Sequence, residues 1–493
     1  MSLPLHPSLY QINTTVHLNE IGAQLSRAAT LDDIPDAELN QIAQSGFDFV
    51  WLLGVWQTGP AGRRVSLSNA DWLREFRATL PDFQPSDVCG SCFAIRDYHV
   101  NQAFGGDEAL ARIRDRLAAR GIRLMLDFVP NHTALDHAWV DEHPDFYVAG
   151  SEEQLAAAPQ NYCRLTTRNG DRIFAHGRDP YFPGWPDTLQ LNYANPAMQA
   201  ALSAELERIS SQCDGLRCDM AMLDIPEVFA RTWGLKAEPF WPKAIEKVHR
   251  LNRDFRFMAE VYWDLEWTLQ QQGFDYTYDK RLYDRLREKD AHSVREHLMA
   301  GLDYQGKLAR FLENHDEPRA AATFPSFPNH RAAAILTFLT PGMRFFHQGQ
   351  FEGKCVRISM HLCRGPVEAA NPEIGAFYGA LLQLLRDPLF RNGDWKLLTC
   401  RPAWQGNWTW DCVVAFSWTG TRGERRLIAV NYSDHQSQCY VTLPWPDLAA
   451  HDWRLQDRMG TAVYQRHGAD LAAHGLYLDL ALWGYNVFNV EAA

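Results

Sequence analysis

The sequence predicts an α/β protein built on a (β/α)8 TIM barrel, with an excursion domain after the third strand and a C-terminal antiparallel β domain. Strand-like and helix-like segments alternate through roughly the first 390 residues, which is typical of repeated strand-helix units around a parallel sheet. Eight strand-like segments can be counted there, and eight strands close a barrel. Beyond about Asn392 the helical period is lost and short strands remain.

The expected barrel strands are short apolar runs of the kind that parallel sheets bury on both faces. They begin at Leu9, Phe47, Gly121, Gly215, Phe255, Phe274, Leu308 and Gly342. We expect the first strand to run through residues 9–18. Helical patterns, with apolar residues three or four apart, precede the third strand at 106–121 and the fourth at 195–212. Asp107 and Pro196 lie near the expected helix starts.

Domain boundaries are expected where this alternation breaks. Residues 133–196 form a polar, aromatic and proline-containing stretch, and a loop of that length in a compact domain is usually functional. We therefore expect residues 1–132 and 197–391 to form the barrel and 133–196 the excursion domain. Residues 392–493 should form a β-sandwich, with strands at "CVVAFSWTG", "RRLIAVNYS", "QCYVTLPW", "LYLDLAL" and "GYNVFNVE".

The charge balance favours a neutral partner. The formal net charge is -12, which argues against nucleic acid or an anionic membrane as the main partner. Residues 1–18 have neither a basic segment nor a continuous apolar run of the kind found in secretion signals. The most apolar stretch, 332–346, is too short to span a bilayer. We expect no membrane-spanning segment and a cytoplasmic location.

Cysteine spacing gives one candidate metal or redox site. Cys89 and Cys92 are separated by two residues, as in a zinc half-site or a redox motif. The other cysteines do not form a second half-site with comparable spacing. We interpret the cysteines as small apolar packing residues and assign no metal to them.

Three carboxylates follow apolar strand-like runs: Asp219 in "GLRCDMA", Glu260 in "FRFMAEVYW" and Asp316 in "LARFLENHDEPR". A carboxylate so close to a buried run is costly unless it has a partner or a function. Residues at the carboxyl ends of barrel strands converge on one pocket even when they are remote in sequence. Two carboxylates flanking a glycosidic bond, with a third holding ring hydroxyls, are suited to retaining glycoside chemistry. The sequence therefore predicts an enzyme with a small carbohydrate substrate.

The neighbours of these carboxylates predict their separate roles. Arg217 and Asp219 are two apart on one strand, so their side chains should share a face. The guanidinium should then lower the pKa of Asp219 and keep it anionic for attack on an anomeric carbon. Glu260, near other carboxylates, should retain its proton to higher pH and protonate the leaving group. Asp316 would hold the ring hydroxyls and favour a distorted ring.

The motifs "DFVPNHT", "GLRCDMA", "AEVYW" and "LENHDE" resemble, in order and spacing, the four short signature regions of glycoside hydrolase family 13, the α-amylase family. "TLQLNYANP" resembles the fifth region. The resemblance implies the barrel, the excursion domain, the C-terminal β domain and retention of the α configuration. It implies that Asp219 is the nucleophile, Glu260 the acid/base and Asp316 the transition-state stabiliser.

The same resemblance implies a set of residues that contact the sugar. Arg217, His132 and His315 would surround the ring at subsite minus one, and Asp127 would brace Arg217. Phe93, in "GSCFAIRDYHV", stands where the family usually has a stacking tyrosine. Asp97 is either structural or a sugar contact. The candidate tryptophans for stacking on a sugar are Trp139 and Trp185 in the excursion and Trp263 beyond Glu260.

Two departures from the family limit the prediction of substrate. Met222 and Leu223 occupy positions where many α-amylases have a Lys-His pair that lines the acceptor side, which weakens an assignment to endo-hydrolysis of starch. Asn131 matches a family calcium ligand, but the excursion has no convincing cluster of partner carboxylates, and calcium needs six or more oxygen ligands. We assign no metal and no cofactor, with calcium as the open alternative.

The leading hypothesis is an α-glucan or α-glucoside hydrolase acting by double displacement on short oligosaccharides. A transglycosylase or phosphorylase of the same family is the alternative among enzymes, because it would share every catalytic residue. A non-catalytic barrel serving as a binding subunit is the alternative outside enzymes. Binding subunits that resemble this family usually lose a catalytic carboxylate, whereas this chain keeps all three. The sequence does not predict the oligomeric state.

Overall fold

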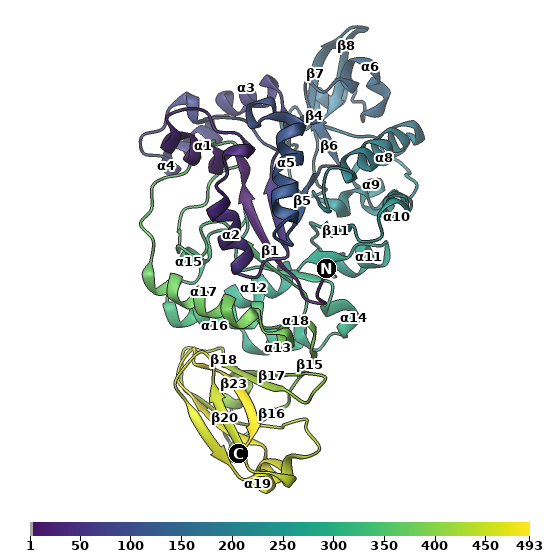
Figure 1. Ribbon diagram of the computed structural model, residues 1–493. Coiled ribbons are helices and arrows are strands. Elements are labelled where there is room, and N and C mark those ends of the chain that lie inside the picture. The colour runs from purple at the N-terminus through teal and green to yellow at the C-terminus, as the bar shows by residue number, and fades with distance from the viewer. Residues whose placement is uncertain (1–2) are drawn as a thin grey trace.

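A computed structural model describes residues 3–493, and Figure 1 shows a closed barrel with a separate β domain below it. Met1 and Ser2, the first residues of the predicted barrel domain, lie outside the described residues. Eight parallel strands close the barrel in the order β1-β14-β13-β12-β11-β10-β5-β2. They are β1 (Ser8–Asn13), β2 (Phe49–Leu53), β5 (Arg123–Phe128), β10 (Gly215–Cys218), β11 (Arg256–Ala259), β12 (Tyr276–Tyr278), β13 (Leu308–Arg310) and β14 (Met343–His347). Each predicted barrel strand has its counterpart here, and the predicted fold class is confirmed.

The first predicted strand was too long. β1 ends at Asn13, whose side-chain oxygen accepts a hydrogen bond from the Val16 backbone amide at 3.2 Å. That bond caps α1 (Thr14–Leu25), so the chain turns into a helix five residues before the predicted strand end. The apolar residues at Val16 and Leu18 that suggested a strand are buried on this helix instead.

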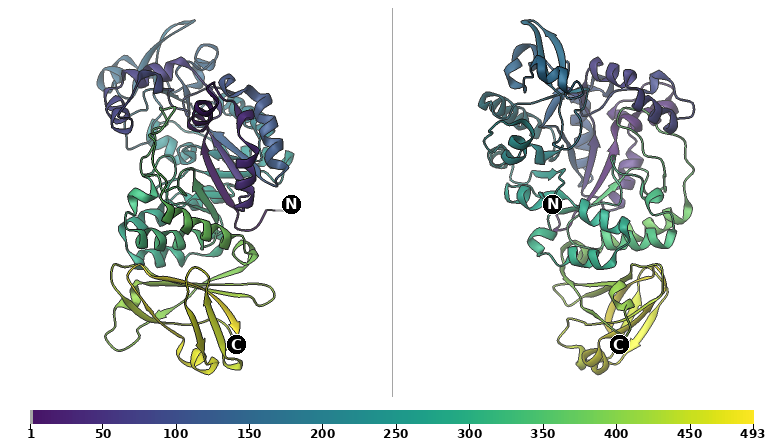
Figure 2. Two further views of the ribbon diagram at one scale, coloured as in Figure 1. Left: turned by 60° about the vertical axis from the view of Figure 1, so that its left-hand side comes forward. Right: turned by 180° about the vertical axis from the view of Figure 1, so that it is seen from behind.

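Helices surround the barrel (Figure 2). The two predicted helices are α5 (Gly106–Ala118) and α8 (Pro196–Ser210). In α8, Asn195 accepts a bond from the Ala197 amide and Pro196 takes the first position, where its missing N–H costs nothing. The other helices of eight or more residues before the C-terminal domain are α2 (Asp36–Gln44), α3 (Pro60–Ser68), α4 (Ala70–Thr79), α9 (Pro226–Trp233), α10 (Trp241–Leu251), α12 (Lys280–Glu288), α13 (Ala291–Leu298), α16 (Phe327–Phe338) and α17 (Pro372–Leu385). Shorter ones are α6 (Trp139–Glu142), α7 (Glu152–Ala157), α11 (Glu266–Gln271), α14 (Leu302–Gln305), α15 (Ala320–Thr323) and α18 (Pro388–Asn392).

The segment after β5 forms the excursion seen at the top of Figure 1. β6 (His132–Ala134) pairs antiparallel with β9 (Thr188–Gln190). Between them in the sequence, β7 (Tyr162–Thr167) and β8 (Gly170–Ala175) form a hairpin. Two further insertions escaped sequence reasoning. One follows β2 and holds β3 (Trp56–Thr58), α3, α4 and β4 (Ile95–Val100); the other is the irregular chain between β14 and α17.

The C-terminal region is an antiparallel β domain. A six-stranded sheet has the order β15-β17-β18-β23-β20-β21, and a three-stranded sheet the order β16-β19-β22. Both sheets contribute side chains to one buried cluster, including Ala415, Leu427, Cys439 and Leu478. The five predicted strands are β17 (Val413–Thr419), β18 (Arg425–Asn431), β19 (Ser437–Val441), β22 (Leu476–Leu480) and β23 (Tyr485–Ala492). Sequence reasoning missed β15 (Asp394–Leu397), β16 (Cys400–Arg401), β20 (Trp453–Asp457), β21 (Val463–Arg466) and helix α19 (Gly468–His474).

Within residues 3–493, no helix combines the length and the apolar character needed to cross a membrane.

Candidate active site

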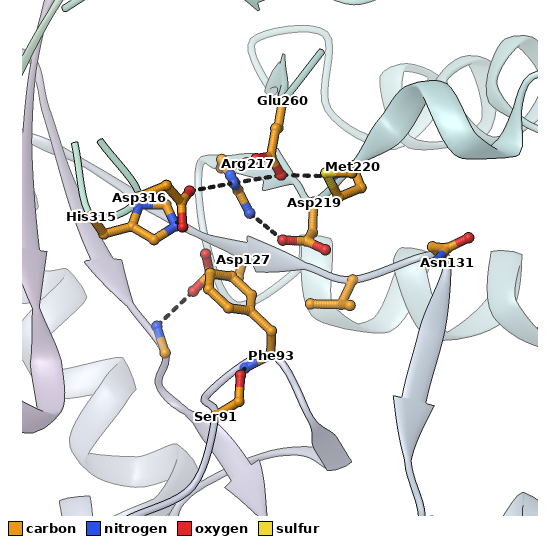
Figure 3. Close-up of polar contacts among 12 residues, drawn as sticks. Ser91, Phe93, Asp127, Asn131, Arg217, Asp219, Met220, Glu260, His315 and Asp316 are labelled. Atoms are coloured by element: carbon orange, nitrogen blue, oxygen red, sulfur yellow. Dashed lines mark hydrogen bonds and ion pairs between the residues drawn. The ribbon is translucent and has the colours of Figure 1, made fainter. Parts of the chain in front are cut away.

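The three predicted carboxylates meet above the carboxyl ends of the barrel strands. Asp219 directly follows β10 and Glu260 directly follows β11, while Asp316 lies six residues beyond the end of β13. The ladder continues past the strands, because the Asp219 amide donates to the Phe128 carbonyl at 2.8 Å and the Glu260 amide to the Cys218 carbonyl at 3.0 Å. Figure 3 shows the three side chains pointing toward one guanidinium, that of Arg217.

Arg217 is fully buried and ties the site together. Its Nη1 donates to Asp219 Oδ1 at 2.6 Å, and its Nη2 lies 2.6 Å from Glu260 Oε2 and 4.0 Å from Asp316 Oδ2. Its Nε donates to the hydroxyl of Tyr278 at 3.1 Å. The expectation that the side chains of Arg217 and Asp219 point to the same side agrees with this geometry, although Asp219 lies one residue beyond β10. One positive charge therefore serves three carboxylates, so the cluster is held together and remains net negative.

Burial sets the proton affinities of Asp219 and Glu260. Burial raises the pKa of Asp219 above its usual value, although the contact with Arg217 opposes this. The lowered pKa that we expected for Asp219 is therefore wrong, since desolvation outweighs the guanidinium. Burial also raises the pKa of Glu260 to about 7, against the opposing charge of Arg217 and with support from the negative charge of Asp219. Glu260 thus keeps its proton to higher pH than an ordinary glutamate.

The pKa of Asp316 is shifted in the opposite direction. Burial opposes its ionisation, but His315, whose Nε2 lies 2.9 Å from Asp316 Oδ2, and Arg217 outweigh burial and bring the pKa of Asp316 below its usual value. The ring of His315 is fixed from its other side, where Nδ1 is 2.9 Å from the Gln11 amide nitrogen. The site therefore combines a readily ionised carboxylate with one that favours its protonated form.

Asp127 does not brace Arg217 through a direct hydrogen bond. The two residues are neighbours in register on β5 and β10. However, Asp127 Oδ1 accepts from Trp51 Nε1 at 3.0 Å, and Oδ2 accepts from the Gly54 amide at 2.6 Å. The predicted contact is replaced because the backbone of the turn after β2 reaches the carboxylate. Burial raises the pKa of Asp127 to about 6, and the nearby charge of Arg217 opposes that rise.

His132, His315 and Phe93 lie close to the carboxylates. Phe93 lies with its ring centroid 5.3 Å from the Arg217 guanidinium and 5.4 Å from the His315 ring. His132 lines the cavity with Phe93. Burial lowers the pKa of His132 to about 3, so the ring is neutral at physiological pH. A neutral imidazole can still donate one hydrogen bond to a hydroxyl.

Asp97 lies outside the site. It is on β4, its side chain is half exposed, and its Oδ1 is 2.5 Å from Nδ1 of His99. The neighbouring Tyr98 takes the buried side of the strand, where its hydroxyl contacts the Val129 backbone. Alternation along β4 therefore turns Asp97 outward, and of the two roles left open for it the structural one agrees with this position.

The tryptophans flagged in the sequence have different positions. Trp185 lines the cavity, with its ring 5.2 Å from that of His132. Trp139 packs edge-on against Phe146 at 5.3 Å. Trp263 lies just beyond Glu260 in a left-handed conformation, with its ring 5.0 Å from that of Tyr181.

Asn131 does not point at the carboxylates (Figure 3). Its side-chain oxygen accepts a bond from the Gln190 amide at 2.8 Å. The part of the chain that the structure describes has no group of three or more His, Cys, Asp or Glu side chains placed to hold a metal ion. The assignment of no metal, with calcium as the open alternative, stays an untested prediction. Met222 and Leu223, which replace the Lys-His pair, are buried in the short 3-10 helix Ala221–Asp224.

All ten cysteines are free thiols. Cys89 and Cys92 are partly buried, and burial raises the pKa of both thiols. A thiol with a raised pKa is a poor metal ligand and nucleophile at neutral pH. This agrees with the interpretation of these two cysteines as packing residues.

The carboxylates open into a cavity of about 320 Å³. Its lining includes several residues that sequence reasoning missed: Trp72, Glu75, Ser91, Asp187, Thr188, Met220, Arg357, Ser359, Met360 and His361. Most of them belong to the two unpredicted insertions, in which only the stretch around Phe93 resembles a family segment. Asp187 is buried, one of its carboxylate oxygens has no hydrogen-bond partner among the described residues, and burial raises its pKa to about 6.

Two tyrosines behind the cavity were also missed. The hydroxyl of Tyr278 accepts a hydrogen bond from Arg217, and the hydroxyl of Tyr262 donates one to Glu260 Oε1 at 2.8 Å.

The fold and the site together define the class of protein. It is a closed parallel barrel in which carboxylates at the strand ends surround one arginine, as in a carbohydrate-binding site. The family model of the alpha amylase catalytic domain matches residues 46–361. The chain therefore belongs to the α-amylase family, as the sequence motifs indicated.

Individual relatives are distant. The chain is 24% identical over 354 residues to trehalose-6-phosphate hydrolase of Escherichia coli strain K12, covering 63% of this chain and 59% of that protein. It is 30% identical over 185 residues to trehalose synthase/amylase TreS of Mycolicibacterium smegmatis, covering 34% of this chain and 30% of that protein. The chain thus spans less than two thirds of these curated relatives. The solved structure of a maltogenic alpha-amylase from Thermotoga neapolitana superposes with a TM-score of 0.71 at 17% identity, covering 100% of both chains, and supports the fold.

Proposed function

We propose that this protein is a retaining α-glycosidase that cleaves α-glucosidic bonds of oligosaccharides or α-glucans. The observation that carries the proposal is the convergence of Asp219, Glu260 and Asp316 on the buried guanidinium of Arg217 at the mouth of a family 13 barrel. Asp219 is the nucleophile, Glu260 the general acid and base, and Asp316 the residue that binds ring hydroxyls.

The proposed reaction has two displacements. Asp219 Oδ attacks the anomeric carbon as the bond to the leaving oxygen breaks, and Glu260 gives its proton to that oxygen. In the resulting ester Asp219 no longer carries a charge, so the pKa of Glu260 falls and its carboxylate can accept a proton from water. The water oxygen bonds to the anomeric carbon and the Asp219 carboxylate leaves. Two inversions at that carbon retain the α configuration.

The lining of the cavity favours an uncharged substrate. It holds five carboxyl side chains, Glu75, Asp187, Asp219, Glu260 and Asp316, against one arginine, Arg357. Arg217 lies behind the carboxylates and is already engaged by them. A phosphorylated sugar would add negative charge to this set, at a cost that one paired arginine would not offset. The proposed substrate is therefore a neutral glucoside, unlike the phosphorylated sugar named for the E. coli relative.

A covalent trap tests the proposal. Incubation with a 5-fluoro-α-glucosyl fluoride should add the mass of one fluoroglucosyl group, recovered after proteolysis on the peptide that contains Asp219. The Asp219→Asn variant should lose the adduct and about 10⁴-fold or more of its turnover, while still binding sugar. Asp97→Asn is the matched control and should keep both. An adduct on another residue, or near-native turnover of Asp219→Asn with deamidation excluded, would refute the assignment.

Transfer to a sugar acceptor is the second candidate. It is supported by the similarity to TreS and by the apolar pair Met222 and Leu223, which replaces the usual acceptor-side Lys-His pair. Separation of products with and without added glucose or phosphate distinguishes the two outcomes. Free monosaccharide alone supports hydrolysis, while new disaccharide or sugar phosphate supports transfer.

We also propose that the protein acts in the cytoplasm without a cofactor. The ten free thiols support a reducing compartment, and the proposed chemistry uses only side chains of this chain.

A further inference from the structure

We infer that an ion pair between Glu75 and Arg357 closes one end of the active-site cavity, so that the protein accepts only the non-reducing end of an α-glucoside chain. The inference rests on the proposed function and specifies its substrate class. Both side chains line the cavity, and Arg357 Nη2 donates to Glu75 Oε1 at 2.7 Å. The two residues come from separate insertions, Glu75 from α4 and Arg357 from the chain after β14.

Packing behind the pair makes it a wall rather than a chance surface contact. Phe76, Leu80, Val88 and Leu362 form a buried cluster that joins the two insertions. Val88 and Leu362 also form an isolated antiparallel bridge. An exposed ion pair by itself contributes little to stability. Here the apolar cluster fixes the backbones, and the pair spans the gap between them.

Aromatic contacts continue the wall beside the ion pair. The rings of Trp72 and His361 lie 4.2 Å apart, one from each insertion, and both line the cavity. Ser66 holds His361 through a 2.9 Å contact to Nδ1. Burial lowers the pKa of His361 to about 4, so the ring is neutral and packs as an aromatic. A polysaccharide chain could pass this side only by separating these contacts.

The wall lies at the end of the cavity that would hold the sugar ring bonded to Asp219 in the covalent intermediate. Arg357 is near enough to Asp316 for its charge to help lower the pKa of that carboxyl. Asp316 is the proposed hydroxyl-binding residue, whereas Glu260 protonates the leaving oxygen. The wall near Asp316 therefore faces the far end of the bound ring, and the leaving group departs elsewhere. A cavity of about 320 Å³ is at the small end of ligand sites, as expected for one sugar ring and part of a second.

A substrate with a blocked end tests the wall. We would compare kcat/KM for maltotetraose with that for the same chain carrying a 4,6-O-ethylidene group on its non-reducing ring. The native protein should prefer the free chain by about 100-fold or more. Glu75→Ala and Arg357→Ala should each reduce this preference at least tenfold. Glu152→Ala, which removes a comparable exposed ion pair with Arg164 on the excursion, should leave the preference unchanged.

Each outcome decides a separate point. Native turnover of free and blocked chains at equal rates would overturn the wall and leave the proposed function standing. An unchanged preference in both wall variants, with thermal unfolding confirming that they are folded, would also overturn it. If an alanine variant does not fold, Glu75→Ser keeps a polar residue on α4 but is too short to reach Arg357, and the same tenfold reduction is expected. No native turnover of either chain would overturn the proposed function, and the inference with it.

Discussion

A single buried guanidinium surrounded by carboxylates dominates the site at the scale of residues. Arg217 stabilises charge on Asp219 and on Glu260, while burial opposes it on both. Glu260 receives three contacts that favour its charged form: from Arg217, from the Met220 amide at 2.8 Å and from the Tyr262 hydroxyl at 2.8 Å. Even so, its pKa is raised to about 7. Its proton affinity is therefore a balance that a single substitution can shift.

Tyr262→Phe should shift that balance measurably. Loss of the hydroxyl removes a donor to the carboxylate of Glu260, so the charged form loses about 0.5–1.5 kcal/mol and the pKa rises by about 0.5–1 unit. The proposed acid must be protonated, so kcat/KM should fall as pH rises through the pKa of Glu260, near 7 in the native protein. In Tyr262→Phe this alkaline limb should move upward. The pH dependence of kcat/KM measures it.

Tyr98→Phe is the control, because its hydroxyl contacts the Val129 backbone and not Glu260. It should leave the alkaline limb in place. A limb that stays near 7 in Tyr262→Phe, or moves equally in the control, would contradict the assignment of this limb to Glu260.

The contacts of a single residue could be predicted from the sequence only where the position of its backbone determines them. Asp219 and Glu260 directly follow strands, so their convergence could be predicted from strand order. The partners of Asp127 could not, because they depend on where the Gly54 turn lies across the barrel. The sign of the Asp219 pKa shift was missed for a similar reason. The sequence identifies Arg217 as a neighbour but does not measure burial, which is the larger effect here.

At the scale of elements, a glycine turn links the barrel to the Phe93 platform. Gly54 follows β2 with φ at +77°, and its amide donates to Asp127 at 2.6 Å. A Cβ at this position would lie 2.6 Å from Cβ of Cys92, next to Phe93 in sequence. The turn therefore needs glycine both for its backbone conformation and for space.

Gly54→Ala should lower the free energy of unfolding by about 2–4 kcal/mol, combining the left-handed backbone with overpacking. It should also reduce activity, because Cys92 must move and Phe93 with it. Gly121→Ala is the matched control: its φ is +74°, but nothing lies within 4 Å of its added Cβ. That variant should lose only about 1–2 kcal/mol and keep its activity. Chemical denaturation of both variants gives the comparison, and equal losses would show that the Cys92 contact does not matter.

Sequence reasoning found the barrel elements because each apolar run between helices had a single plausible role. The insertions after β2 and β14 escaped it, because α3 and α4 resemble ordinary connecting helices and the chain between β14 and α17 has almost no regular structure. Their meeting through Val88 and Leu362 joins residues far apart in sequence. The carboxylate side of the cavity could therefore be predicted, and the side formed by the two insertions could not.

At the scale of the whole molecule, the apolar core of the barrel continues onto one face of the β domain. Along β17, Val413 and Ala415 join the cluster inside the β domain, while Val414, Phe416 and Trp418 join the cluster of the barrel. Trp418 is fully buried, and its Nε1 donates to the Leu339 carbonyl at the end of α16 at 2.8 Å. The Tyr432 hydroxyl donates to the Leu286 carbonyl at 2.7 Å. Figure 1 shows the β domain at the end of the barrel away from the excursion.

Because this core is continuous, we expect the native chain to unfold in one calorimetric transition. Trp418→Ala should cost about 3–5 kcal/mol and, by removing the side chain that spans the interface, should separate the melting of the β domain from that of the barrel. Trp453→Ala is the control, since Trp453 is buried in the cluster inside the β domain. It should lower the melting temperature while keeping one transition, because the interface stays intact. A native chain that melts in two steps, or a single transition in Trp418→Ala, would mean that the shared core does not couple the two parts.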